Sequence, residues 1–381
     1  MKILIVTEYF PESLRGEMSG GVEARAFYIA SELARDNDVT VICGRTGNSK
    51  AKDSFGKIEV LRPVKHEYSH NASFFSRMRF AVGAYRAARE IKADVVDGYN
   101  FISYIPAYFA AKKIGAKKIA TYHETWIGEW IKNKGMITGA FGSLWERFVL
   151  GLKWDKIISV SEFTKKRLAE RGVPKEKIFV VPNGIDLREY EKVGAEKSKN
   201  PTICCISRLV KTKRVEDLIN ALQIIKKEIP SIRCKIIGIG DEMDFLRKLA
   251  VKNGVEKNVE FIGRVKNHDD VIRAIKSSHV LCHPSILEGF GIVVVEAMAC
   301  GIPYVCSDIP PLIEVTHNGK GGLIFKGTNP EDLSEKLLLI FRDRKLYRQK
   351  AGEGRELAKK YDWRALAGKI EKNYLSVSGK R

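Results

Sequence analysis

Residues 281–298, LCHPSILEGFGIVVVEAM, hold the pattern from which the fold of the whole chain can be argued. The apolar run His279–Cys282 indicates the end of a buried strand. A loop follows, and a helix is expected over residues 292–299, because residues 300–303, Cys-Gly-Ile-Pro, give it a glycine-then-proline ending. The stretch therefore predicts a strand, a turn and a helix, the repeating unit of an α/β fold.

The turn in this stretch has the chemistry of a ligand site. Glu288 lies in the loop and Glu296 lies one turn inside the expected helix. Gly289 and Gly291 let the backbone approach a ligand closely, and the free N–H groups of a helix start can hold an anion. The pattern predicts a site for a phosphorylated, hydroxyl-rich ligand, with a strand-turn-helix whose glutamates face solvent as the alternative.

The same alternation of strands and helices runs through the rest of the chain. Further strands are expected at residues 2–7, 39–43, 58–62, 94–97, 119–122, 155–161, 178–181, 203–206, 234–239, 259–262, 304–306 and 321–324. Further helices are expected at residues 21–35, 74–92, 102–114, 162–171, 215–228, 270–276, 330–342, 344–359 and 364–377. This alternation predicts two doubly wound α/β domains with ligands at the carboxyl ends of their strands.

Composition narrows the class of protein. A chain of 381 residues suits two domains, and no apolar run approaches the roughly 20 residues of a membrane span. Its seven cysteines are scattered without a C-x2-C pair, which predicts reduced, buried thiols in a cytoplasmic protein. The net charge of +20 favours anionic partners, although solvated lysine-rich faces would also explain it. No nucleic-acid module is recognisable, so we expect no nucleic-acid partner.

Further candidate residues follow other expected strands. Gly20-Gly21 opens the first helix but lacks the dinucleotide fingerprint, and His123 stands at the carboxyl end of a strand. Arg208 and Lys213 share one loop, where a pair of fixed cations suits a diphosphate. Each of these residues, taken alone, is more often structural.

Taken together, the motifs resemble those of the retaining glycosyltransferases of family 4, which have the GT-B fold. The E-x7-E pair with the EGFG form is similar to the donor-binding signature of that family. The other motifs of the family stand in its order at Gly20-Gly21, His123, Pro182-Asn183-Gly184-Ile185-Asp186 and Arg208/Lys213. The resemblance covers essentially the whole chain.

The resemblance implies two Rossmann-like domains facing each other across a cleft. The N-terminal domain, 1–186, would bind the acceptor, and the C-terminal domain, 187–360, would bind the nucleotide sugar. A last helix, 361–378, would pack back onto the first domain.

The resemblance also implies a metal-independent, retaining transfer of a hexose-type sugar from a UDP- or GDP-linked donor, with no other cofactor. The catalytic residues would be His123, Arg208, Lys213 and Glu288. Glu288 would hold donor-sugar hydroxyls, Glu296 the ribose and His123 the sugar at the reaction centre. The donor-binding set would be Gly20, Gly21, Arg208, Lys213, Arg264, Val265, Glu288, Gly289, Phe290, Gly291, Ile292, Val293 and Glu296.

Two other functional classes remain open from the sequence. One is another GT-B enzyme, such as a sugar-nucleotide epimerase, and the other is a non-catalytic sugar-nucleotide-binding protein. A glycan, a glycolipid or a small molecule could be the acceptor. The basic helix 74–92 and the aromatic, basic stretch 126–154 favour a lipid-linked acceptor and a peripheral place on the inner face of an anionic membrane. A surface helix covering a sheet, and helices packed on the first domain, are the alternative readings of these two stretches.

Overall fold

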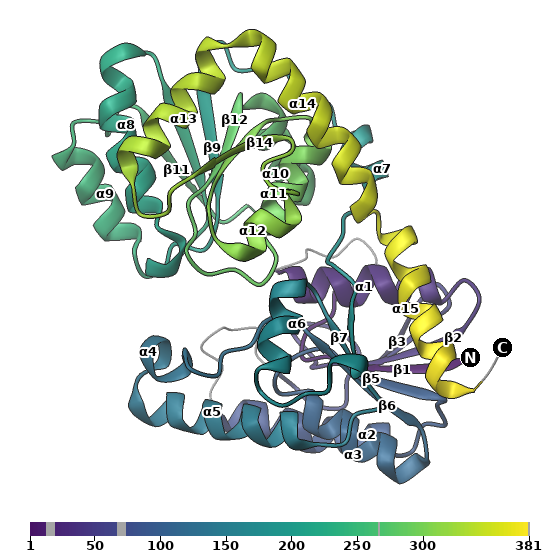
Figure 1. Ribbon diagram of the computed structural model, residues 1–381. Helices are drawn as coiled ribbons and strands as arrows, with labels where there is room; N and C mark the ends of the chain where they lie inside the picture. Colours follow the sequence, from purple (N-terminus) through teal and green to yellow (C-terminus); the bar gives the residue numbers. More distant parts are fainter. Residues whose placement is uncertain (13–19, 67–73, 266, 380–381) are drawn as a thin grey trace. The chain divides into compact units, whose positions relative to one another are not determined.

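The computed structural model describes residues 1–12, 20–66, 74–265 and 267–379. The chain forms two compact units, of which the first contains Met1–Asn183 and Trp363–Arg381 and the second contains Gly184–Asp362. Each unit is built on one sheet with helices on both of its faces (Figure 1). This architecture confirms the predicted fold class of two doubly wound α/β units.

The described residues of unit 1 form eight strands in the order β3-β4-β2-β1-β5-β6-β7-β8. They are β1 Lys2–Val6, β2 Asp38–Ile42, β3 Lys52–Phe55, β4 Ile58–Leu61, β5 Val95–Gly98, β6 Lys117–Tyr122, β7 Lys156–Ser159 and β8 Ile178–Val180. Its helices are α1 Gly21–Leu33, α2 Phe74–Ala88, α3 Tyr104–Ile114, α4 Trp130–Lys134, α5 Met136–Gly151, α6 Glu162–Ala169 and α15 Trp363–Ser378, with the short 3-10 turn η1 Lys175–Lys177. All pairs are parallel except β3 with β4, in which Lys52 lies opposite Leu61.

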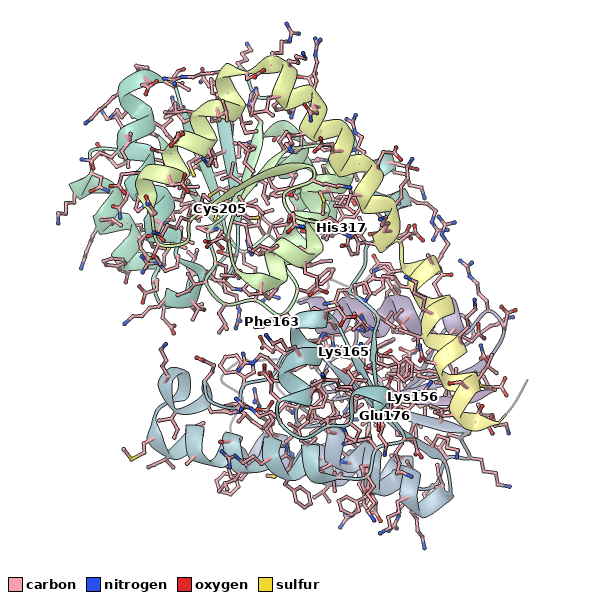
Figure 2. All side chains as sticks on the ribbon, in the orientation of Figure 1. Lys156, Phe163, Lys165, Glu176, Cys205 and His317 are labelled. Atoms are coloured by element: carbon pink, nitrogen blue, oxygen red, sulfur yellow. The ribbon has the colours of Figure 1, made fainter. Side chains whose placement is uncertain are left out.

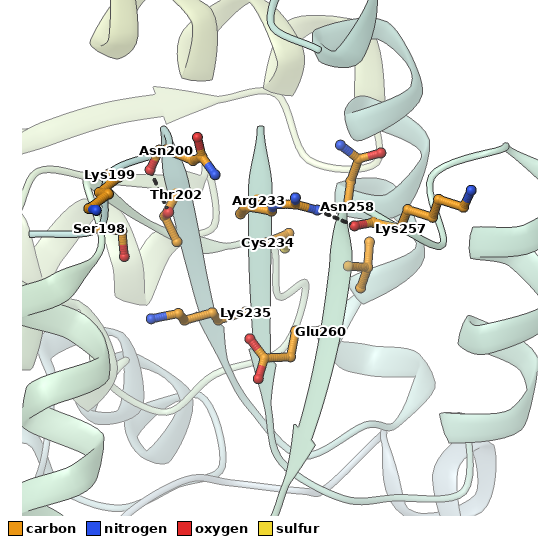
Figure 3. A pocket seen from close by; sticks show the side chains of 11 residues that line it. Ser198, Lys199, Asn200, Thr202, Arg233, Cys234, Lys235, Lys257, Asn258 and Glu260 are labelled. Carbon is orange, nitrogen blue, oxygen red and sulfur yellow. Dashed lines mark hydrogen bonds between the residues drawn. The ribbon is translucent and has the colours of Figure 1, made fainter. Parts of the chain in front are cut away.

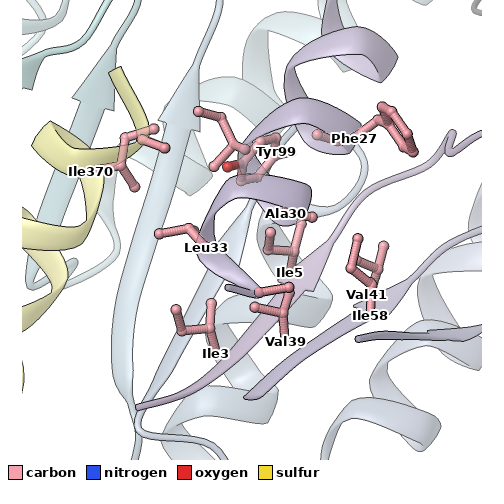
Figure 4. Packing of buried hydrophobic residues seen from close by; sticks show 14 of the residues in the cluster. Ile3, Ile5, Phe27, Ala30, Leu33, Val39, Val41, Ile58, Tyr99 and Ile370 are labelled. Carbon is pink, nitrogen blue, oxygen red and sulfur yellow. The ribbon is translucent and has the colours of Figure 1, made fainter. Parts of the chain in front are cut away.

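The two faces of the sheet in unit 1 carry different helices. Ile3 and Ile5 of β1 pack with α1 and α15 in one apolar cluster, shown in Figure 4. Leu4 and Val6 point to the opposite face, where they pack with α2 and α3. The alternation follows from the period of two along a strand. Trp363, at the start of α15, stacks on Tyr28 of α1 with ring centroids 5.9 Å apart.

The described part of unit 2 contains six parallel strands in the order β11-β10-β9-β12-β13-β14. They are β9 Thr202–Ile206, β10 Arg233–Ile237, β11 Val259–Gly263, β12 Val280–His283, β13 Tyr304–Ser307 and β14 Gly322–Phe325. Its helices are α7 Leu187–Lys192, α8 Val215–Glu228, α9 Met243–Lys252, α10 His268–Ser277, α11 Ile292–Cys300, α12 Pro310–Val315, α13 Pro330–Arg342 and α14 Arg344–Ala358, with the 3-10 turns η2 Lys211–Lys213 and η3 Lys359–Tyr361.

The structure adds elements that the sequence pattern does not predict. The edge strand β3, KDSF, has no apolar alternation, and α7, α9 and α12 are short helices in stretches that we expected only as connections. The helix expected over 74–92 ends at Ala88. The stretch between Trp126 and Trp154 forms α4 and α5.

All seven cysteine thiols are buried and unpaired, as the sequence predicts. Cys205, marked in Figure 2, lies on β9 within the apolar cluster of unit 2. Burial raises the pKa of its thiol to about 12, so it behaves as a small apolar side chain.

Candidate functional site

The sheet of unit 2 reverses its winding direction at β9, which has β10 on one side and β12 on the other. In open α/β sheets, ligands bind at the carboxyl ends of the strands that flank such a point. Arg208 follows β9, and the loop that carries Glu288 follows β12. Two of the predicted site loops therefore lie at the position where the topology favours a ligand.

Glu288 lies in the loop after β12, among the loops at the carboxyl ends of the strands, and its side chain is 14% exposed. One carboxylate oxygen, Oε1, accepts hydrogen bonds from Lys213 Nζ at 2.5 Å and from His283 Nε2 at 2.7 Å. Burial alone would raise the pKa of Glu288, but the Lys213 ammonium and the His283 hydrogen bond outweigh it and bring the pKa to about 2. Glu288 is therefore ionised at neutral pH, and neither contact uses its second oxygen, Oε2.

The Glu288 loop is fixed by contacts with η2. The backbone N–H of Ile286 donates to Thr212 O at 2.9 Å, and Lys213 Nζ also donates to Leu287 O at 3.3 Å. Ser285 Oγ lies 3.2 Å from Thr212 O and 3.0 Å from Leu287 O, and its single hydroxyl proton is shared between these two acceptors. Lys213 and Glu288 are thus held in place before any ligand binds.

The loop leads into α11, whose N-terminus no side chain caps. Gly291 is the N-cap and has φ 92°, a conformation that favours glycine. An added Cβ there would lie 2.4 Å from the side chain of Leu312. No acidic residue occupies the first turn of this helix, which begins at Ile292 and Val293, so it can receive an anion. Gly289 belongs to the same loop, and Phe290 is buried against the ring of Tyr361.

Glu296, one turn further along α11, has a different environment. Tyr190 OH, from α7, donates to Glu296 Oε1 at 3.2 Å and lies 3.1 Å from His268 Nε2. Burial raises the pKa of Glu296, while His268 and the Tyr190 hydrogen bond oppose that rise. Among the described residues, this carboxyl group therefore has hydrogen-bonding neighbours but no ammonium in contact with it.

The remaining predicted residues of unit 2 lie on neighbouring loops. Arg208 is exposed, directly after β9, and Arg264 and Val265 follow β11. The loops after β9 and β10 are in close contact, because a Cβ at Gly238 would lie 1.8 Å from Ser207 O and one at Gly240 would lie 2.2 Å from Leu209 O. These two glycines allow the basic loop to pack against its neighbour.

In unit 1, His123 follows β6 directly and is half-buried. Burial and the positive charge of Arg25 lower its pKa to about 3, against a hydrogen bond with the backbone of Tyr99. Nε2 has no hydrogen-bond partner among the described residues. Since Nδ1 is then the nitrogen that donates to the Tyr99 carbonyl, Nε2 of the neutral ring can accept a hydrogen bond from a hydroxyl.

A buried polar network lies close to this histidine. Asp97 Oδ2, on β5, accepts hydrogen bonds from Thr121 Oγ1 at 2.9 Å and from Tyr374 OH at 2.6 Å. Burial raises the pKa of Asp97 to about 7, against these bonds and the charge of Arg25. Arg25 is itself fully buried and donates through one nitrogen to Pro182 O and Asn183 Oδ1, at 2.8 and 3.0 Å. The Pro-Asn-Gly turn therefore anchors a buried guanidinium in unit 1.

Gly20 and Gly21 stand at the start of α1, with Gly20 as the N-cap. An added Cβ would meet no atom within 4 Å at either position. Packing within the described structure does not require glycine there, and the donor-binding role remains a prediction.

Sequence reasoning missed several residues of these sites. In unit 2 they are His283, which ends β12, Tyr190 of α7 and His268, the first residue of α10. In unit 1, Glu8 follows β1 and is buried, and it contacts His66 Nε2 at 2.9 Å, Tyr9 OH at 3.1 Å and Asn100 Nδ2 at 3.3 Å. Glu8 and Asn100 flank the winding reversal of unit 1, between β1 and β5. An acidic residue directly after a buried strand was the only sequence signal for this cluster.

No group of three or more His, Cys, Asp and Glu residues that could hold a metal ion occurs among the described residues. The expectation of metal-independent chemistry stays a prediction.

A separate hollow of about 410 Å³ lies at the opposite, amino ends of β9, β10 and β11 (Figure 3). Arg233, Lys235 and Glu260 are among the residues that line it. It contains none of the predicted site residues, and its place at the amino ends separates it from the loops described above.

Two family models match the chain. The model of glycosyl transferases group 1 covers residues 186–357, and that of glycosyltransferase family 4 covers residues 19–189. An uncharacterized glycosyltransferase of Methanocaldococcus jannaschii is 26% identical over 99% of both chains. The GDP-mannose-dependent monoacylated alpha-(1-6)-phosphatidylinositol monomannoside mannosyltransferase of Corynebacterium glutamicum is also 26% identical, over 90% of this chain and 89% of the relative.

Solved structures share the fold over almost the whole chain. Sucrose-phosphate synthase of Thermosynechococcus elongatus superposes with a TM-score of 0.83 at 18% identity, over 99% of both chains. Anabaena HepE in complex with UDP-glucose superposes with a TM-score of 0.78 at 18% identity, over 99% of this chain and 100% of the other. The two family models together span residues 19–357, and the chain belongs to the group 1 glycosyltransferases with the GT-B fold.

Proposed function

We propose that the protein transfers a hexose-type sugar from a UDP- or GDP-linked donor to an acceptor hydroxyl, with retention of configuration and without a metal ion. The observation that carries the proposal is the ionised Glu288, held by Lys213 and His283 beside the uncapped N-terminus of α11. One edge of a sheet then offers a carboxylate for sugar hydroxyls together with cations and a helix start for phosphates.

The leaving diphosphate is the charge that the site has to stabilise. Its charge grows as the bond between the sugar and the phosphate oxygen breaks, and Lys213, Arg208 and the α11 N-terminus supply fixed positive potential near that edge. The new bond forms between the anomeric carbon and the acceptor oxygen on the face that the diphosphate leaves. The acceptor proton passes to the leaving phosphate oxygen, so the step balances without a protein nucleophile.

Glu288 and Glu296 have distinct proposed roles. Oε2 of Glu288 accepts hydrogen bonds from donor-sugar hydroxyls, because Oε1 is already bonded to Lys213 and His283. Glu296 accepts from the ribose hydroxyls, with Tyr190 fixing its orientation. In unit 1, the lone pair of His123 Nε2 accepts a hydrogen bond from the transferred sugar.

We assign the recognition of the acceptor to unit 1, where Glu8, His66 and Asn100 meet at the winding reversal. A lipid-linked acceptor is favoured because the mannosyltransferase of Corynebacterium glutamicum, similar over 90% of this chain, is named for a phosphatidylinositol mannoside. The buried, unpaired thiols fit a reducing compartment, so we place the reaction in the cytoplasm.

A thermal-shift screen of UDP, GDP, ADP and their sugar conjugates, with and without EDTA, tests the donor assignment. A specific ligand at a hundredfold excess over its dissociation constant stabilises the folded protein by about 2.7 kcal/mol. We expect a shift from one nucleotide class that EDTA leaves unchanged. No shift from any nucleotide would contradict the proposal, and a shift abolished by EDTA would contradict its metal-free form.

A variant of Glu288 tests whether the ligand found in this screen binds at the proposed site. Glu288→Gln keeps the shape but removes the charge that pairs with Lys213, and we expect the affinity for the sugar conjugate to fall by at least tenfold, the order of a lost charge-assisted hydrogen bond. The matched control is Glu335→Gln, an exposed glutamate of α13 in the same unit. Equal affinity in the two variants would remove Glu288 from the site.

A further inference from the structure

The outward face of α5 in unit 1 is apolar. Four large side chains lie on it, with exposed fractions of 89% for Ile137, 40% for Phe141, 68% for Leu144 and 52% for Phe148. At 100° per residue these positions fall within an arc of roughly 60°, and they extend for roughly 16 Å along the helix. They form one continuous stripe, which we call the α5 stripe.

The inward face of the same helix is built from smaller or charged residues. Gly139, Gly142, Glu146 and Val149 are its buried positions, on the side opposite the α5 stripe. A surface helix normally turns its large apolar side chains to the core, whereas α5 turns four of them outward. Such an exposed patch marks an interaction surface.

Specific contacts hold α5 in this orientation. A Cβ at Gly139 would lie 2.5 Å from the Ile131 backbone, so α4 packs directly on the α5 backbone. Glu146 accepts hydrogen bonds from Trp130 Nε1 at 2.6 Å and from the backbone N–H of Trp126 at 3.1 Å. Turning the stripe inward would break these bonds and leave a carboxylate without partners.

Two neighbouring helices extend the surface. α2 and α3 pack on the same face of the unit 1 sheet as α5, whose Trp145 joins the clusters of both (Figure 1). Their outward positions combine large apolar and basic side chains. These positions are Phe75, Arg79, Val82 and Arg86 on α2, and Phe109, Lys112 and Lys113 on α3.

The exposed charged side chains of α2, α3 and α5 are all positive. Across α2, α3 and α5 the sequence contains a single acidic residue, Glu146, and it is buried. Arg77 is partly buried, with Nε 3.5 Å from Glu8 Oε1. The other basic residues of these helices are exposed and have no exposed acidic neighbour on their own elements, and they are Arg79, Arg86, Lys112, Lys113 and Arg147. A second copy of the chain would place cations against cations, which disfavours self-association through this layer.

We propose that the layer formed by α2, α3 and α5 lies on an anionic lipid bilayer, with the α5 stripe entering the headgroup region. No helix within the described ranges is long and apolar enough to cross a membrane, so the contact is with one leaflet. The arginines and lysines meet the lipid phosphates, while the large apolar side chains leave water. This surface supports the acceptor class proposed above, but it does not depend on sugar transfer.

Co-sedimentation of the full chain with vesicles, without donor or acceptor, tests the surface. We expect binding to phosphatidylcholine vesicles that contain phosphatidylglycerol, weak binding to phosphatidylcholine alone, and weaker binding as salt rises. Phe148→Glu should lower the vesicle affinity roughly tenfold or more, because a large apolar side chain no longer leaves water. Arg79→Ala should lower it roughly fivefold.

The control for Phe148→Glu is Phe245→Glu on α9 of unit 2, because the two phenylalanines are 52% and 50% exposed. Phe245→Glu should bind like the unchanged protein. An unchanged affinity of Phe148→Glu, or equal loss in both variants, would overturn the proposal. A dimer in sedimentation analysis that Phe148→Glu dissociates would assign the stripe to a second copy instead. Nucleotide binding is measured separately, so failure here leaves the transfer proposal standing.

Discussion

Glu288 of unit 2 and Asp97 of unit 1 are both carboxyl groups removed from water, and their acidities differ by several orders of magnitude. The pKa of Glu288 is lowered to about 2, whereas that of Asp97 is raised to about 7. Glu288 has the Lys213 ammonium at 2.5 Å on one of its oxygens. Asp97 has hydroxyl donors, Thr121 and Tyr374, and only the more distant field of Arg25.

The difference shows what keeps a buried carboxylate ionised. Hydroxyl hydrogen bonds lower the pKa of Asp97 but do not offset its burial, since its side chain is fully enclosed. A contacting cation does offset burial in Glu288, which also keeps some access to solvent. We therefore expect Glu288 to serve ligand binding and Asp97 to serve the stability of unit 1.

Removing the cation gives the largest expected effect. Lys213→Ala takes away the ammonium partner of Glu288 and a cation proposed to stabilise the diphosphate, so kcat should fall roughly 10²- to 10³-fold. The matched control is Lys211→Ala, an exposed lysine of the same 3-10 turn, whose loss should leave kcat nearly unchanged. Equal rates for both variants would contradict the role of Lys213.

A double-mutant cycle separates this binding role from stability. Lys213→Ala alone leaves the largely buried Glu288 carboxylate without its ammonium partner, held only by His283, and should cost about 3 kcal/mol of the free energy of unfolding. Adding Glu288→Gln should restore part of that loss, because the charge that lost its ammonium partner is gone. Strictly additive losses in urea denaturation would show that the two residues do not interact.

The sequence predicts local helices and strands better than contacts between residues that are far apart along the chain. Periodicity and turn residues predict α8 with the bounds that the structure shows, Val215–Glu228, and the strand end expected at His279–Cys282 lies within one residue of β12, Val280–His283. They miss β3, because an edge strand of sequence KDSF has no buried face to create an apolar pattern. Short helices such as α12 carry too few turns for a period to appear.

The same limit applies to the candidate site. The resemblance to family 4 selects Lys213 and Glu288, but not their contact, since 75 residues separate them and only the sheet order brings them together. Asp97 and Tyr374 are 277 residues apart, on elements whose pairing depends on how the last helix packs in unit 1. Motifs identify the residues, and topology determines which of them meet.

The raised pKa of Asp97 predicts a pH dependence of stability. Its folded pKa, about 7, lies above the value of 3.8 for an unperturbed aspartate, so the folded state holds the proton more tightly. The stabilisation is complete below pH 4 and is lost as the pH rises towards 7. Asp97→Asn removes this titration, so between pH 5 and 8 the variant should gain about 3 kcal/mol relative to the unchanged protein in urea unfolding. A constant difference across that range would contradict the assignment.

His123 should give the stability of unit 1 a pH dependence of the opposite sign to that of Asp97. Its pKa is about 3 when folded, below the value of 6.5 for an unperturbed histidine, so the unfolded chain binds the proton first. The contribution of the neutral His123 ring to the free energy of unfolding is therefore present above pH 6.5 and is lost as the pH falls towards 3. His123→Gln should therefore lose about 2 kcal/mol less than the unchanged protein between pH 6.5 and 4.5. Parallel urea-unfolding curves for the two proteins would show that the folded ring titrates normally.

The smallest effect concerns the hydroxyl that α15 contributes to Asp97. Tyr374→Phe removes the 2.6 Å hydrogen bond to Oδ2 and should cost about 1 kcal/mol of unfolding free energy. Because that bond lowers the pKa of Asp97, the cost should be larger at pH 8, where the carboxylate is ionised, than at pH 5. The control is Tyr347→Phe on α14, a partly buried tyrosine of unit 2. If both variants lost the same stability at both pH values, the hydroxyl of Tyr374 would have no specific part in holding Asp97 or in setting its protonation.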